Sequence, residues 1–269
     1  MTIKILSPTW GHENWPINDF LKKIKEAGYD GVDTWIPDDP QDKKALLDGL
    51  QQYELVLVAH QHQAQGDSFE AFKTSFKKYL QICAEAQPLL INSHTGRDYF
   101  SFEQNLALID IAQAFSEKTG IIVAHETHRG RLGSAPFTIT DYFKARDNFL
   151  ITADLSHWTC VSESMLEHFQ PVVEEAIKRT RHLHARVGYE QGPQVPDPRA
   201  AEWNYALNTF FGWWDAMVAH NKQLGRDVFT ITTEFGPPPY MPAMPYTRQP
   251  LADQFEVNCF MKNILATRY

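Results

Sequence analysis

The chain alternates short apolar runs with amphipathic segments along its whole length. The apolar runs are rich in leucine and β-branched residues, which is typical of strands that are covered on both faces. Between them, apolar residues recur every three or four positions, which predicts helices with one buried face. The expected strands lie in residues 3–10, 29–37, 54–62, 88–96, 121–134, 149–158, 182–188 and 228–236.

Helices are expected between consecutive strands, at residues 16–28, 41–53, 69–80, 102–119, 140–146, 163–177, 203–225 and 255–265. Pro171 should break or restart the sixth of them. Eight strand–helix pairs without a low-complexity linker favour one α/β domain over residues 1–269, a closed (β/α)8 TIM barrel. The rival fold is an open doubly wound sheet, which usually has a glycine-rich phosphate turn after its first strand. Here the first strand leads into SPTWGHEN instead.

Acidic and imidazole side chains stand at the exits of the last four expected strands: Glu126, Asp154, His184 and Glu234. In a barrel of this kind the carboxyl ends of the strands form the active face, so these four side chains should converge. Their oxygen and nitrogen atoms suit one divalent cation, and manganese, magnesium, cobalt and zinc all remain open. Any one of them taken alone is more simply a helix cap or an ion-pair partner.

The remaining histidines divide by their position on the strands. His157 lies three residues after Asp154 and is expected to contact substrate, whereas His60, His62 and His94 should line the far wall of the pocket or hold a second metal. His182 shares a face with His184 and is either a ligand or a structural residue. His125 points away from Glu126, so it should face the helices.

Arginine and tryptophan side chains also gather near the strand exits. Positive charge there could bind a substrate phosphate or carboxylate, and the candidates are Arg129, Arg131, Arg186 and Arg199. Three indoles, those of Trp10, Trp35 and Trp158, could stack on a sugar ring or pack beneath the loops. The sequence has no nucleophile elbow and no P-loop.

Composition narrows the choice of partner and compartment. The net charge of −8 argues against a broad nucleic-acid surface and favours a small-molecule partner. Three dispersed cysteines suggest no disulfide framework, so we expect a reducing cytoplasm. The N-terminus has no charged-then-apolar leader, and no apolar run approaches the ~20 residues of a membrane helix. We therefore expect a soluble protein without a membrane partner.

The order Glu, Asp-x-x-His, His, Glu at strands five to eight resembles the xylose isomerase-like superfamily of TIM barrels, which includes sugar isomerases, ketose 3-epimerases and AP endonucleases. The resemblance spans the chain. It implies that Glu126, Asp154, His184 and Glu234 hold one divalent metal and that His157 binds a substrate oxygen. It also implies that Glu126 and Glu234 move a proton between carbons through a metal-stabilised enediolate.

The sequence departs from these relatives at two points. The epimerases carry an arginine six residues beyond the metal histidine, where this chain has Glu190. The endonucleases carry Asp-x-His after strand seven, where this chain has Asp197, Pro198 and Arg199. The leading expectation is an isomerase or epimerase of a small sugar or sugar phosphate. A zinc phosphodiesterase, a dehydratase and a non-catalytic binding barrel stay open, as does a homo-oligomer through the aromatic helix near residues 203–214.

Overall fold

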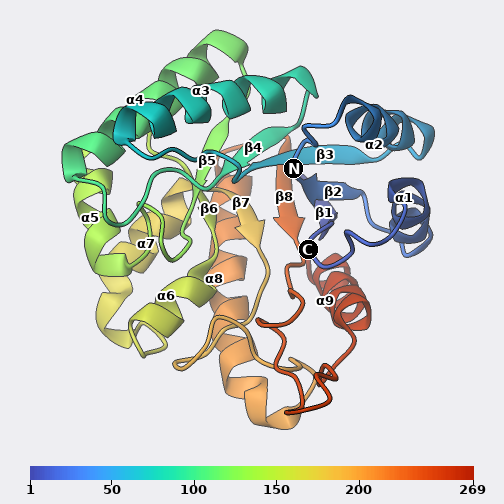
Figure 1. Ribbon diagram of the computed structural model, residues 1–269. Coiled ribbons are helices and arrows are strands. Elements are labelled where there is room, and N and C mark those ends of the chain that lie inside the picture. The colour runs from blue at the N-terminus through green and yellow to red at the C-terminus, as the bar shows by residue number, and fades with distance from the viewer.

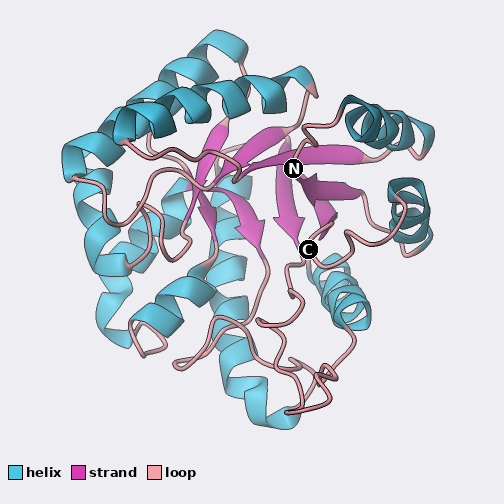
Figure 2. Cartoon of the chain, viewed as in Figure 1, coloured by secondary structure: helices cyan, strands magenta, loops and turns pink.

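Eight parallel strands close into a barrel in sequence order, and the computed structural model describes all residues, 1–269. The strands form the centre of the molecule and the helices surround it (Figures 1 and 2). The strands are β1 (Thr2–Pro8), β2 (Gly31–Thr34), β3 (Val56–Gln61), β4 (Leu90–Ser93), β5 (Val123–Glu126), β6 (Ile151–Ala153), β7 (Thr180–His184) and β8 (Val228–Thr232). The predicted (β/α)8 barrel is confirmed.

Closure of the barrel depends on the first and last strands. Thr2 of β1 pairs with Val228 of β8, and the register runs on to Leu6 opposite Thr232. Every strand therefore has two neighbours, and no unpaired sheet edge remains to recruit another chain. Helix α9 also packs against β1, so the C-terminal segment lies beside the strand pair β1–β8 that closes the barrel.

Nine α-helices form the outer ring: α1 (Ile17–Glu26), α2 (Pro40–Gln52), α3 (Phe69–Glu85), α4 (Phe102–Thr119), α5 (Pro136–Ala145), α6 (Leu155–Val161), α7 (Gln170–Arg179), α8 (Asn204–Gln223) and α9 (Gln254–Arg268). Local sequence explains several of their ends. Ser101 and Gln104 form a capping box at the start of α4, and Gly120 ends that helix with a φ of 75°. Asp39 accepts hydrogen bonds from two backbone N–H groups at the start of α2.

The region after β6 differs from the expectation. The strand predicted over 149–158 stops at Ala153, because Asp154 caps α6 by accepting a hydrogen bond from the Ser156 N–H. His157 therefore lies on a helix. The helix predicted from residue 163 begins only at Gln170. Pro171 occupies its first turn, where a missing N–H costs nothing, so the proline starts this helix rather than breaking it.

The packing of the barrel interior fixes where polar chemistry can occur. Below the strand exits it holds a small buried apolar cluster of Leu6, Val58, Leu90 and Ala124, together with the buried polar pair His182 and Thr230. The large apolar core lies between the strands and the surrounding helices. Towards the strand exits the buried side chains become polar, and this end carries the candidate site. None of the helices is both long and apolar enough to cross a membrane.

Candidate functional site

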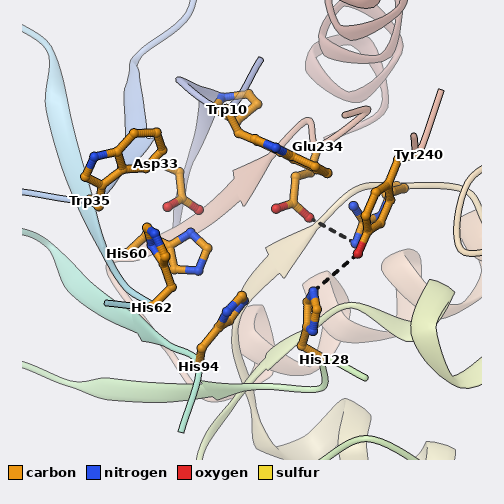
Figure 3. A pocket seen from close by; sticks show the side chains of 11 residues that line it. Trp10, Asp33, Trp35, His60, His62, His94, His128, Glu234 and Tyr240 are labelled. Carbon is orange, nitrogen blue, oxygen red and sulfur yellow. Dashed lines mark hydrogen bonds and ion pairs between the residues drawn. The ribbon is translucent and has the colours of Figure 1, made fainter. Parts of the chain in front are cut away.

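A cavity of about 190 Å³ opens at the carboxyl ends of the strands (Figure 3). Its walls carry seven of the candidate site residues, namely Trp10, Trp35, His60, His62, His94, Arg186 and Glu234. The other lining residues are Pro8, Asp33, His128 and Tyr240. Aromatic and imidazole rings therefore surround a small acidic space.

The four predicted metal ligands meet beside this cavity. One ligand atom from each of Glu126, Asp154, His184 and Glu234 lies within 4.8 Å of the others. Nδ1 of His184 is 2.7 Å from a Glu234 oxygen and 3.5 Å from a Glu126 oxygen. All four residues are buried. The barrel thus brings together side chains that are more than one hundred positions apart in sequence.

Hydrogen bonding tests whether these residues suit a cation. Three of the converging atoms form no well-aligned hydrogen bond, namely Oε1 of Glu126, Nδ1 of His184 and Oε2 of Glu234, although the last two are 2.7 Å apart. A buried polar atom without a partner costs free energy, so three of them facing one another need a common partner. A divalent cation satisfies two carboxylate oxygens and one imidazole nitrogen at once. These residues fit such an ion.

Asp154 is bound differently from the other three. Its Oδ1 accepts hydrogen bonds from the backbone N–H (3.1 Å) and the hydroxyl (2.5 Å) of Ser156, and its Oδ2 accepts one from Arg186. Arg186 itself is 1% exposed and lies against the ligand group instead of at the loop surface. Asp154 is therefore a helix cap and an ion-pair partner as well as a member of the converging group.

Asp33 orients His184, one of the predicted metal ligands. One oxygen of Asp33 is 2.9 Å from Nε2 of His184 and 3.1 Å from Nε2 of His182, and it accepts a 3.0 Å hydrogen bond from Thr232. A carboxylate in this position fixes the ring so that Nδ1 of His184 faces Glu126 and Glu234. On its other side His182 contacts the Thr230 hydroxyl at 2.7 Å, so both of its ring nitrogens have protein partners.

The pKa values of the two glutamates are shifted in opposite directions. Burial raises the pKa of Glu234 above the ordinary carboxyl range, against the opposing effects of His184 and Arg186. Burial would also raise the pKa of Glu126, but His94 and His184 together hold it well below its usual value. Burial would lower the pKa of His184, yet Glu234 and Glu126 raise it well above normal. Two carboxyl groups displaced in opposite directions suit an acid and a base.

Histidines from the neighbouring strands approach Glu126 from the other side. Nε2 of His94 is 3.0 Å and Nε2 of His60 is 3.6 Å from its Oε2, and the three residues form a second group with metal-ligand spacing. A third group joins Glu126 to His128 and His157, whose rings are 4.0 Å apart. Glu126 is the residue shared by these groups and by the four-ligand group.

The other predicted residues take simpler positions. Trp10 and Trp35 line the cavity, whereas Trp158 is fully buried and donates a hydrogen bond to the Gly133 carbonyl. His125 contacts Thr95 and Phe149 away from the cavity, as expected. At the rim, Arg129 stacks on Tyr240 and Arg131 approaches His94, while Arg199 is paired with Asp197.

Comparison with known proteins agrees with this architecture. Residues 21–196 match the family described as "Xylose isomerase-like TIM barrel". The chain belongs to this family. No curated protein sequence matches the chain.

Solved structures of the same fold include enzymes of three kinds. A 3-keto-D-glucoside 4-epimerase from E. coli is 12% identical, with coverage of 99% of this chain and 100% of that one and a TM-score of 0.60. A probable 3-DHS dehydratase from Bacillus anthracis is 16% identical over 100% of both chains, with a TM-score of 0.59. Endonuclease IV from Thermus thermophilus is 14% identical over 87% and 93%, with a TM-score of 0.54. At these identities the likeness shows the fold, and the reaction has to be argued from the site.

Four residues of the site were not anticipated from the sequence: Asp33, Asn92, His128 and Tyr240. Asp33 stands at the end of β2 and carries the same strand-exit signal as the predicted ligands, so the pattern could have identified it. Asn92 donates a 2.9 Å hydrogen bond to Glu126, but an amide inside a strand has no distinctive signal. Tyr240 lies on the proline-rich loop after β8, outside any periodic element, and contacts His128 at 3.4 Å.

Proposed function

We propose that this protein is a sugar isomerase or epimerase that depends on one divalent metal ion. The observation that carries the proposal is the convergence of unpartnered atoms from Glu126, His184 and Glu234, with Asp154 alongside, next to a cavity lined by aromatic rings. When bound there, a divalent cation would supply the positive charge that stabilises an enediolate. Manganese, magnesium, cobalt and zinc all suit this mixture of ligands.

In this proposal Glu126 and Glu234 move the substrate proton. Both carboxylates contact Nδ1 of His184, so a substrate that reaches a cation held there would lie within reach of either one. His157 and Arg186, whose side chains are 2.9 Å apart, would hold a substrate oxygen beside them. His60, His94 and Trp10 would complete the wall around the sugar.

The charge of the cavity bears on the substrate. Arg186 is the one guanidinium among the lining residues, and it is already paired with Asp154. A phosphate group usually requires unpaired arginine or lysine side chains. The cavity therefore favours an uncharged sugar or ketone as substrate. A sugar phosphate, whose phosphate would reach Arg129 and Arg131 at the rim, is the alternative substrate to compare with it.

Deuterium uptake from heavy water tests the proposed proton transfer. A panel of ketoses, aldoses and their phosphates is incubated with metal-loaded protein and the products are analysed by mass spectrometry. We expect exchange at a substrate carbon in the wild type and at least about a 100-fold loss in Glu234→Gln. Glu190→Gln is the matched control, because Glu190 pairs with Tyr205 outside the cavity. Full exchange in Glu234→Gln would contradict the assignment.

A second candidate function is a zinc-dependent phosphodiesterase, and the His60, His94 and Glu126 group favours it. Metal counting separates the two: one ion per chain supports isomerisation, whereas two or three zinc ions with cleavage of a phosphodiester support hydrolysis. The same substrate panel detects a further alternative, a dehydratase, as a product lighter by one water.

A further inference from the structure

A second cavity, of about 360 Å³, lies at the opposite end of the barrel, where the strands begin. Arg181 at the start of β7 and Arg226 in the turn before β8 both line it. The remaining walls are mostly apolar: Leu89, Leu90, Ile122, Leu224, Gly225, Asp227, Val228 and Thr230. None of its lining residues lines the cavity at the strand exits, so it is a distinct site.

The two arginines line one cavity and neither has a counter-charge, unlike the arginines that pair with carboxylates elsewhere in the protein. Arg146, Arg199 and Arg268 each bind the carboxylate of an aspartate. Neither Arg181 nor Arg226 forms an ion pair, and the Nε atom of each is buried without a hydrogen-bond partner. The hydrogen bond made by Arg181 goes to the Thr180 carbonyl at 3.1 Å.

Electrostatics at this end of the barrel are unfavourable as they stand. Burial, and after it the charge of Arg226, lowers the pKa of Arg181 to about 10. Burial also lowers the pKa of Arg226. Asp227 lines the same cavity but pairs with neither guanidinium. Two half-buried like charges with free donors are stabilised when an anion binds between them.

We propose that this cavity binds a small oxyanion through Arg181 and Arg226. Guanidinium groups match the oxygens of phosphate and carboxylate with parallel hydrogen bonds, which a lysine pair would not do. The apolar walls from Leu90, Ile122 and Leu224 suit the short carbon chain of an organic phosphate or carboxylate. The site does not depend on the proposed isomerase activity.

The first test measures phosphate binding to chelator-treated protein, so that no metal at the other end can bind phosphate. Inorganic phosphate and glycerol phosphate are titrated by calorimetry and by ³¹P line broadening. We expect millimolar affinity, weakened at least tenfold in Arg181→Gln and in Arg226→Gln. Arg248→Gln is the control, because Arg248 is exposed on the loop after β8. Tighter binding of glycerol phosphate would identify an organic anion as the ligand class, and equal binding would identify the free ion.

The second test reverses the charge of one of the two arginines. Arg226→Glu places a carboxylate beside Arg181 and should raise the melting temperature in phosphate-free buffer by about 2 °C. Phosphate at ten times its Kd should raise the melting temperature of the wild type by a similar amount, and that of the variant not at all. Absence of phosphate binding in the wild type would overturn the proposal. So would unchanged binding in both glutamine variants, with circular dichroism verifying that they fold.

Discussion

The two ends of the barrel are built from the same strands but carry opposite charges. At the exits of β7 and β8, His184 and Glu234 converge with Glu126 and Asp154, and the facing oxygen and nitrogen atoms would be satisfied by a cation. At the entrances of the same strands, Arg181 and Arg226 present donors that need an anion. A parallel barrel keeps these groups a full strand length apart, so each end can bind a different ligand.

A buried polar chain connects the two ends. Thr230, which lines the cavity between Arg181 and Arg226 at the strand entrances, contacts His182, and His182 contacts Asp33. Asp33 in turn holds His184 of the candidate metal site. This chain raises the question of whether the ends act independently, and substitutions along it can answer the question.

Glu126→Gln should have the largest effect, because Glu126 belongs to three of the groups with metal-ligand spacing. We expect metal affinity to fall by more than about 100-fold, beyond the loss that follows removal of an outer partner. Calorimetry with zinc and with manganese measures the change. The matched control is Glu175→Gln on α7, whose carboxylate pairs with Arg179 outside the cavity. Wild-type affinity in Glu126→Gln would mean that the cation site lies elsewhere.

Asp33→Asn should have the next largest effect. An amide keeps the size of the side chain but removes the charge that orients His184, so metal affinity should fall by about 10- to 100-fold. Asn92→Asp, which alters a residue in contact with both Glu126 and His184, shows whether the loss is specific to the Asp33 contact. An unchanged binding isotherm for Asp33→Asn would show that the barrel alone orients the histidine.

The contrast between Glu126 and Asp33 also shows what the sequence could predict. The barrel followed from eight apolar runs, and the four converging ligands followed from polar residues placed at their ends. The partners that arrange these ligands were harder to find. Asp33 carries the strand-exit signal, but its contact with His184 joins β2 to β7 across the barrel, and the inward position of Arg186 depends on its pairing with Asp154. Pairings of this kind are decided by packing across the barrel, which periodicity does not describe.

Thr230→Val should have a smaller effect, confined to stability. His182 loses its hydroxyl partner but keeps the Thr230 carbonyl at 3.1 Å, so the free energy of unfolding should fall by about 1 kcal/mol. Urea denaturation measures this loss, and metal titration of the same variant gives the more informative result. Metal affinity within about twofold of the wild type would show that the ends are independent, because RT ln 2 is only about 0.4 kcal/mol. A loss as large as that of Asp33→Asn would show that they are coupled.

Asp215→Asn should have the smallest effect, because this aspartate lies on α8 in the outer ring and belongs to neither end. Its hydrogen bond from Arg268, at 2.6 Å, lowers the pKa of the Asp215 carboxyl, but the two side chains are 41% and 39% exposed. A lowered pKa in the folded state means that the pair stabilises the protein above the unfolded carboxyl pKa of about 3.9 and that this contribution disappears as the pH falls through the folded value. Solvent limits it to about 0.5 kcal/mol. Urea denaturation of wild type and variant at pH 7 and pH 3 measures this contribution. The two free energies of unfolding should differ slightly at pH 7 and less at pH 3. A larger difference at either pH would mean that the outer ring, and not only the two ends, carries a strong electrostatic contribution.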